Sequence, residues 1–281
     1  MKVGYRNLYF MSRKIYDMNL RRCGLLPDKS KTDWWVETLF HWLFSIGERY
    51  ESLAYFTATE EQLREELAAQ IQRASGSGLA AKGQVELFFE ALPDIRLLLE
   101  ADLETVLESD PAARSRNEVL LAYPGFFAVA IHRIAHVLFV LEIPVLPRLM
   151  SEYVHSKTGI DIHPGAMVGK RFFIDHGTGI VIGETARIGD HVKMYQGVTL
   201  GALTVSKDLA EIQRHPSIGN DVVIYANATI LGGDTVIGDH SVIGGNVWIT
   251  RSVPAHSLVY HKSEVIVKNK TPFPEPLNYS I

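Results

Sequence analysis

Residues 182–201, IGETARIGDHVKMYQGVTLG, carry an apolar side chain at every sixth position: Ile182, Ile188, Met194 and Leu200. The spacing returns further on at Ile218, Ile224 and Ile230, and then at Leu231, Ile237, Ile243 and Ile249. Six is the period of neither a helix nor a single strand, and it is typical of short strands stacked as the coils of a parallel β-helix. We expect the apolar residue to point into the coil, and the glycine that usually follows it to form the corner.

Two interruptions of this repeat mark candidate functional positions. An earlier run, Ile162, Val168, Ile174 and Ile180, is out of phase by two residues with the run from Ile182, so the β-helix is expected to start near residue 157. The slip falls at Asp175-His176, and a polar pair there is predicted to be pushed outward onto an edge of the coil. Between Leu200 and Ile218 a loop must bulge out, and it ends in Arg214-His215. Loops on a rigid scaffold often carry function.

The N-terminal half has the helical period instead. Apolar residues recur at helical spacing from about residue 31 to residue 150, and Pro93, Pro111 and Pro124 are expected to separate successive helices. We therefore predict an α+β chain in three parts. An α-helical N-terminal domain covers residues 1–155, a β-helix covers residues 156–263, and a proline-containing flexible tail covers residues 264–281.

Composition excludes several functional classes. The 281 residues are 47% hydrophobic and have a formal net charge of −4, with scattered Lys and Arg, so we expect neither nucleic acid nor a membrane as a partner. Cys23 is the only cysteine, which excludes a disulfide within the chain and a thiolate metal cluster and favours the cytoplasm. The most apolar segment, residues 126–146, contains charged residues and is expected to be a buried helix.

His176 is the candidate general base. One turn of such a coil takes about 18 residues. Asp161 precedes His176 by 15 residues, and the slip lies nearby, so Asp161 is expected one coil below His176. An Asp behind a His fixes its tautomer and raises its basicity, which suits removal of a proton from a hydroxyl or amine. The alternative is a purely structural hydrogen bond between neighbouring coils.

A zinc site is the other chemistry that such a coil supports. It would need three converging imidazoles. His256 and His261 are the only close pair in the C-terminal half, and they fall where the repeat has ended. The histidine spacing therefore favours acyl transfer from a coenzyme A thioester over hydration at zinc.

Several motifs follow one another along the chain: Asp161-Ile162-His163-Pro164, Asp175-His176-Gly177-Thr178-Gly179-Ile180, Gly183-Glu184-Thr185, Gly197-Val198-Thr199-Leu200-Gly201 and Arg214-His215-Pro216. Upstream lie Asp110-Pro111-Ala112, Tyr123-Pro124-Gly125-Phe126 and His132-Arg133-Ile134-Ala135-His136. As a set, over about residues 95–260, they resemble the serine O-acetyltransferases, hexapeptide-repeat acyltransferases of cysteine biosynthesis. The resemblance implies a left-handed β-helix and O-acetylation of L-serine, with acetyl-coenzyme A as co-substrate and no metal.

The resemblance also implies catalytic and cofactor-binding residues. His176 would be the general base on the serine hydroxyl and Asp161 its orienting partner, with direct attack on the thioester and no acyl-enzyme. The pantetheine arm of acetyl-coenzyme A would lie against positions with little or no side chain: Gly201, Ala202, Ala226 and Gly245.

Four charged or titratable residues are implied to bind the substrate. Asp110 and Asp175 match the carboxylates that hold the serine ammonium, and Arg214 and His215 match the groups at its carboxylate. An amino acid presents one cation and one anion, so opposite charges can orient its hydroxyl. L-cysteine carries the same two groups, and feedback inhibition at the serine site is expected.

Assembly and partners are implied by the resemblance as well. A homotrimer or a dimer of trimers, that is a hexamer, is expected. The chain ends in Ile281, and in many family members a tail ending in Ile inserts into cysteine synthase. Two features depart from the family pattern: the usual Gly-x-Pro-Ala segment after the repeat is absent, and the loop before Arg214 is longer.

Two alternative functions remain open at this point. The chain could acetylate a different hydroxyl acceptor on the same scaffold, although Asp110, Asp175 and Arg214 favour an amino acid. It could also be a non-catalytic scaffold that binds cysteine synthase through Ile281.

Overall fold

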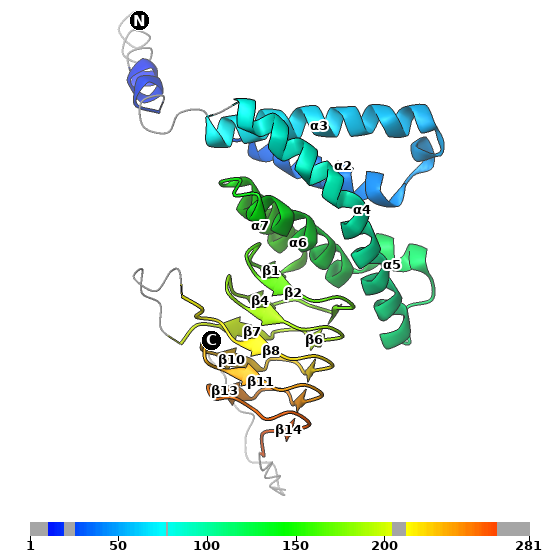
Figure 1. Cartoon of the computed structure of the whole chain (residues 1–281), viewed down its shortest axis with the longest axis vertical. Coiled ribbons are helices and arrows are strands. Elements are labelled where there is room, and N and C mark those ends of the chain that lie inside the picture. Colours follow the sequence, from blue (N-terminus) through cyan, green and yellow to red (C-terminus); the bar gives the residue numbers. More distant parts are fainter. Residues whose placement is uncertain (1–10, 20–25, 77, 204–211, 263–281) are drawn as a thin grey trace, which may run out of the picture.

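The computed structural model describes residues 11–19, 26–76, 78–203 and 212–262, and in it a set of helices precedes a solenoid of parallel strands. Figure 1 shows α6 and α7 above the first coil and the remaining coils stacked below it. The predicted α+β fold is confirmed. The expected flexible tail of residues 264–281 lies outside the described residues.

The helical part begins with a helix over residues 11–19. The later elements are α2 (Lys29–Phe44), η1 (Glu48–Glu51), α3 (Leu53–Ser75), α4 (Gly78–Ser109), α5 (Arg116–Ala122), α6 (Pro124–Val140) and α7 (Leu146–Thr158). Side chains cap two of the N-termini: Asp28 accepts from the backbone N–H groups of Ser30 and Lys31, and Ser52 accepts from that of Tyr55.

One expectation for the helices is wrong, because Pro93 lies inside α4 and does not end it. A proline in a helix interior costs about 3 kcal/mol. Leu92 and Ile95 flank it and are both buried. Burying each such side chain contributes about 1.5–3 kcal/mol, so the core holds the helix together across the proline.

The expected buried helix is present in shortened form, since α6 ends at Val140 and a turn separates it from α7. Most of its side chains are buried. No single helix in the described part of the chain is long and apolar enough to cross a membrane. Only when α5 and α6 are taken together, although bent by 76° at their junction, do they pass that test of length and composition.

The solenoid consists of three parallel sheets that the chain visits in turn. The first sheet contains β1 (Asp161–Ile162), β4 (Val181–Ile182), β7 (Thr199–Gly201), β10 (Thr229–Leu231) and β13 (Trp248–Ile249). The second contains β2 (Met167–Val168), β5 (Arg187–Ile188), β8 (Ser217–Ile218) and β11 (Val236–Ile237). The third contains β3 (Phe173–Asp175), β6 (Lys193–Tyr195), β9 (Val223–Ile224), β12 (Val242–Ile243) and β14 (Leu258–Val259).

The six-residue repeat does mark the inward side chains, with one correction. Ile230 pairs with Leu200 on the preceding coil and with Ile249 on the following coil and is fully buried, whereas Leu231 is only half-buried. β10 continues one residue past Ile230, to Leu231, whereas β4 ends at Ile182, and the corners that follow are equally long, so Ile237 follows Ile230 by seven positions. The apparent restart of the repeat at Leu231 is therefore one extra residue at the end of β10.

The corner glycines serve close stacking more than backbone freedom. Residues with positive φ in several corners are Asn, Asp or His, such as Asp221 (57°) and Asn246 (59°). A Cβ on Gly189 would lie 2.8 Å from the carbonyl carbon of Gly219 on the next coil. Glycine is required there because the next coil leaves no space for a side chain.

A buried ion pair joins the helices to the first coil. Arg133 of α6 donates from Nε to Oδ2 of Asp102 in α4 at 2.6 Å and from Nη2 to Oδ1 at 2.9 Å. The same guanidinium donates to the carbonyls of Val168 and Gly169, and Asp102 accepts from the N–H of Phe172. The two buried charges therefore share hydrogen bonds with each other and with the backbone of the first coil, which ties α4, α6 and that coil together.

We predict that Asp102→Ala lowers the free energy of unfolding by about 3–5 kcal/mol, because it leaves the Arg133 guanidinium buried without a counter-charge. Urea unfolding measures the change. Glu86→Ala is the matched control: it removes a solvent-exposed pair with Arg64 and should cost less than about 1 kcal/mol. Equal small losses for both variants would show that the buried pair is dispensable.

Candidate functional site

The residues singled out from the sequence lie at two opposite edges of the first sheet. We call the segments that enter its strands, residues 176–180 and 196–198, together with Asp175 before them, the His176 edge. The segments that leave its strands, residues 163–166, 183–186 and 212–216, form the His215 edge. One chain therefore holds the predicted residues in two groups.

His176 stands out from the coil because its corner is extended. Five residues separate β3 from β4, whereas three separate β6 from β7, which accounts for the two-residue slip in the repeat. His176 adopts a positive φ of 57° and its side chain is 73% exposed, as the slip predicts. Its Nε2 lies 3.8 Å from Oδ1 of Asp175. An accessible imidazole with a carboxylate beside it suits proton transfer.

Asp110, at the end of α4, faces the same edge. Its Oδ2 accepts from the hydroxyl of Tyr123 at 2.8 Å, and its Oδ1 accepts from the N–H of Ala112 at 2.8 Å. Burial, the hydrogen bond to Asp110 and the charges of Asp110, Glu118 and Asp175 together raise the pKa of Tyr123 to about 12. Because both Asp110 and Asp175 raise the pKa of this one hydroxyl, the two carboxylates lie in the same region of the molecule.

Tyr195 gives a second indication of this acidic space. Burial raises the pKa of the Tyr195 hydroxyl, and Tyr225, Asp175 and Asp110 raise it further. The rings of Tyr195 and Tyr225 stack with centroids 5.1 Å apart. The His176 edge therefore combines a negative field with an imidazole, an arrangement that favours a cationic group near a proton acceptor.

The His215 edge has the opposite character. The Nδ1 of His215 accepts from the N–H of Thr185 at 3.1 Å and lies 2.9 Å from the Thr185 hydroxyl. The backbone N–H groups of Arg214 and His215 both donate to that hydroxyl oxygen. Burial, with Arg214 next, lowers the pKa of His215 to about 4, so the ring is neutral near pH 7. An acceptor Nδ1 places its proton on Nε2.

Close packing holds the His215 ring against Gly183 of the preceding coil. A Cβ on Gly183 would lie 2.1 Å from the His215 Nε2, so only glycine fits at that position. Arg214 forms an ion pair with Glu184. A neutral ring and a cation at this edge are suited to an anionic group.

Asp161 lies away from His176 in a single chain. In the described residues its carboxylate contacts Arg148, with Oδ1 3.4 Å from Nη1, and no ion pair joins it to His176. The reason is the size of the first coil. Asp161 pairs with Val181, 20 positions later, so a residue only 15 positions later falls at the preceding corner. The expected location of Asp161 one coil below His176 is therefore wrong.

The residues expected near the pantetheine arm also divide between the two edges. Gly201 ends β7 and is followed by Ala202, and both lie at the foot of the long loop. Ala226 and Gly245 follow β9 and β12, and a Cβ on Gly245 would lie 3.0 Å from the Ala226 carbonyl oxygen, which shows that they stack on successive coils. Residues 204–211 of the loop lie outside the described residues.

A pocket that the sequence did not indicate lies at the foot of this loop. It is lined by Leu203, Gln213, Arg214, Gly232, Gly233, Asp234, Thr235, Thr250, Arg251 and Ser252. It contains both Arg214 and Arg251, together with Leu203, which follows Gly201 and Ala202 in the chain. Guanidinium groups suit the binding of phosphates. Arg251 stands at the end of the six-residue repeat, which is the only sequence signal that could have pointed to it.

Two groups of side chains in the described part of the chain contain residue types that bind metals. His256 stacks on His240 with centroids 4.9 Å apart, and its ring forms no three-ligand group with described neighbours. Glu152, His155 and Asp161 do have ligand atoms within 4.8 Å of one another. Arg148 already pairs with both of these carboxylates, so the cation at this position is a guanidinium.

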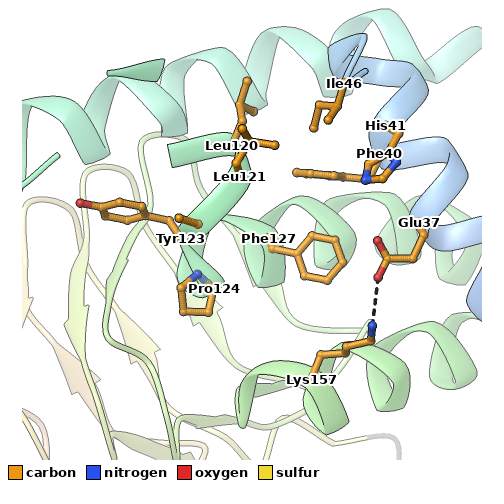
Figure 2. A pocket seen from close by; sticks show the side chains of 11 residues that line it. Glu37, Phe40, His41, Ile46, Leu120, Leu121, Tyr123, Pro124, Phe127 and Lys157 are labelled. Carbon is orange, nitrogen blue, oxygen red and sulfur yellow. Dashed lines mark ion pairs between the residues drawn. The ribbon is translucent and has the colours of Figure 1, made fainter. Parts of the chain in front are cut away.

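A further pocket lies among the helices, and Figure 2 shows Phe40 and Phe127 facing it with the Glu37–Lys157 ion pair at one end. Tyr123 also lines it, and in Figure 2 its ring and hydroxyl extend away from the other side chains. None of the residues assigned from the sequence lines this pocket. It borders the site only through Tyr123.

Comparisons with known proteins point to one family. A family model described as "Serine acetyltransferase, N-terminal" matches residues 50–130. The chain is 54% identical over 179 residues to "Serine acetyltransferase, plasmid" of Synechococcus elongatus, which covers 62% of this chain and 56% of that protein. It is 45% identical over 183 residues to the serine acetyltransferase of Bacillus subtilis, and the match covers 65% of this chain and 82% of that protein.

Solved structures agree along more of the chain. Serine acetyltransferase 1 of Entamoeba histolytica, in complex with L-cysteine, is 34% identical with a TM-score of 0.76, over 90% of this chain and 97% of that one. Isoform 3 from the same organism, in complex with cysteine, is also 34% identical with a TM-score of 0.77, over 84% of each chain.

Proposed function

This chain belongs to the serine acetyltransferase family and is an acyltransferase of cysteine biosynthesis, and on that premise we propose how its residues acetylate L-serine. The observation that carries the proposal is the His176 edge, where an exposed imidazole lies beside the Asp175 carboxylate and where Asp110 and Asp175 both act on Tyr123. Acetyl-coenzyme A is the co-substrate that the family reaction requires.

At the His176 edge the substrate ammonium binds between Asp110 and Asp175, which brings the serine hydroxyl to the imidazole. His176 takes the hydroxyl proton as the serine oxygen attacks the thioester carbon, and it returns that proton to the departing thiolate. The same imidazole thus accepts and then donates the proton, and no acyl-enzyme is needed. Holding the amino acid by its charge brings the reacting atoms together without a covalent step.

The carboxylate of the substrate binds to Arg214 and His215 at the His215 edge. These groups lie across the first sheet from His176, so a complete site requires a second copy of the chain. We propose a homotrimer in which the His176 edge of one copy faces the His215 edge of the next, with Asp161 of that neighbour orienting His176. Exposed Val181 and Trp248 on the first sheet support burial against another copy.

The co-substrate lies along the same groove between copies. Gly201 and Ala202 at one edge, and Ala226 and Gly245 at the other, leave room for the pantetheine arm. Arg251 faces the phosphates in the pocket at the foot of the loop. L-cysteine competes with L-serine because it presents the same ammonium and carboxylate.

The division into residues 1–155, 156–263 and 264–281 is part of this proposal, with the first part pairing two trimers into a hexamer. The last part, which lies outside the described residues, carries Ile281 as an anchor for cysteine synthase. Deletion of Ile281 should weaken binding of cysteine synthase at least about tenfold by calorimetry, because an apolar side chain is lost and the terminal carboxylate is displaced. Unchanged affinity would exclude the tail as the anchor.

Replacing the proposed base tests the mechanism. His176→Ala should reduce kcat at least about hundredfold, measured as serine-dependent thiol release from acetyl-coenzyme A. His240→Ala is a matched control, because His240 is also exposed and has a positive φ of 58° in another corner. Full activity of His176→Ala would remove this residue from the role. Thiol release with another hydroxyl compound, and none with L-serine, would instead point to a different acceptor.

Mixed assemblies test whether the site is shared between copies. His176→Ala and Arg214→Ala each disable a different edge, so a mixed trimer contains one interface with two intact edges. With random mixing, three quarters of the trimers are mixed and each has one intact interface in three, which predicts about a quarter of full activity. A site contained within one chain would give no recovery above the separate variants.

A further inference from the structure

The carboxylate of Asp110 is held in one orientation by two donors. The Tyr123 hydroxyl donates to Oδ2 and the Ala112 N–H donates to Oδ1, each at 2.8 Å. The two donors come from different segments, the start of α6 and the turn after α4. A carboxylate bonded at both oxygens cannot rotate without breaking one of the bonds.

The backbone of Tyr123 is itself fixed by two helices. Its N–H donates to the Val119 carbonyl of α5, and its carbonyl accepts from the N–H of Phe127 in α6. Pro124 follows at the first position of α6 and restricts Tyr123 to the extended conformation that it adopts, with φ −95° and ψ 106°. The ring is therefore carried by a rigid junction.

The junction lies directly against the strand that leads to His176. A Cβ on Gly125 would lie 2.3 Å from the carbonyl oxygen of Ile174, so the first turn of α6 touches the backbone of β3. Asp175 and His176 are the next two residues after Ile174. The same contact that requires glycine at position 125 thus brings Tyr123 and Asp110 over the His176 edge.

The Tyr123 hydroxyl stays protonated near neutral pH. Burial and the neighbouring carboxylates raise the pKa of Tyr123 to about 12. The hydroxyl therefore donates and does not compete for a cation. In Figure 2 the Tyr123 side chain extends away from the other residues of the pocket, and its hydroxyl donates to the Asp110 carboxylate.

We propose that Tyr123 is a positioning residue that holds the Asp110 carboxylate in the orientation required by the ammonium of the amino acid. The proposal rests on the proposed function and extends it to a residue outside the set assigned from the sequence. Tyr123 acts through Asp110 and takes no part in proton transfer. It therefore governs the binding of both L-serine and L-cysteine and leaves the thioester side of the site unaffected.

Tyr123→Phe tests the proposal, because it removes the hydroxyl and keeps the ring. We expect the KM for L-serine to rise about tenfold, the size of one hydrogen bond to a charged group, with kcat lowered less than about threefold. The concentration of L-cysteine for half-inhibition should rise by the same factor, and the KM for acetyl-coenzyme A should not change. Tyr153→Phe is the control, because its hydroxyl bonds Glu37 in the helical part.

A double-mutant cycle separates positioning from a general loss of structure. In an Asp110→Asn background, Tyr123→Phe should change the KM for L-serine less than about twofold further, because the group that Tyr123 orients has already been altered. An undiminished tenfold effect in that background, or a KM within twofold of the unaltered enzyme for Tyr123→Phe alone, would overturn the proposal. Absence of serine-dependent thiol release in the unaltered enzyme would instead refute the proposed function.

Discussion

The contact between Arg133 and Asp102 determines where the helices stand relative to the solenoid. Its guanidinium reaches the carbonyls of the first coil, and its carboxylate accepts from Phe172 at the start of β3. Charges buried at this depth are stable only with complete partners, so the pair tolerates one relative placement of α4, α6 and the coil. That placement brings the end of α4, with Asp110, to the end of β3, with Asp175 and His176.

Close backbone approach does the rest of the positioning. Gly125 lets α6 touch β3, and Gly183 lets the His215 ring pack against the preceding coil. In both cases a methyl group would collide with a neighbouring element. Glycine is therefore needed at these positions because a neighbouring element packs directly on it, and the His176 and His215 edges both depend on such residues.

The number of residues in each coil decides which side chains meet. Asp161 and Val181 are 20 positions apart, whereas Val181 and Thr199 are 18 apart, because the His176 corner is longer by two. The extra residues push His176 outward and also separate it from Asp161 within one chain. The proposed sharing of the site between copies follows from this geometry, since the two edges of one sheet cannot converge.

The sequence alone determined the solenoid, its inward side chains and the outward position of His176, because a strict six-residue period reports geometry that is local to each coil. Motif resemblance also indicated Asp110, Asp175, Arg214 and His215. Tertiary structure alone decided that Pro93 continues a helix, that Leu231 is not an inward residue, that Asp161 lies apart from His176, and that Tyr123 holds Asp110. These features depend on burial and on the summed length of corners, which bring together residues far apart in the chain and leave no periodic trace.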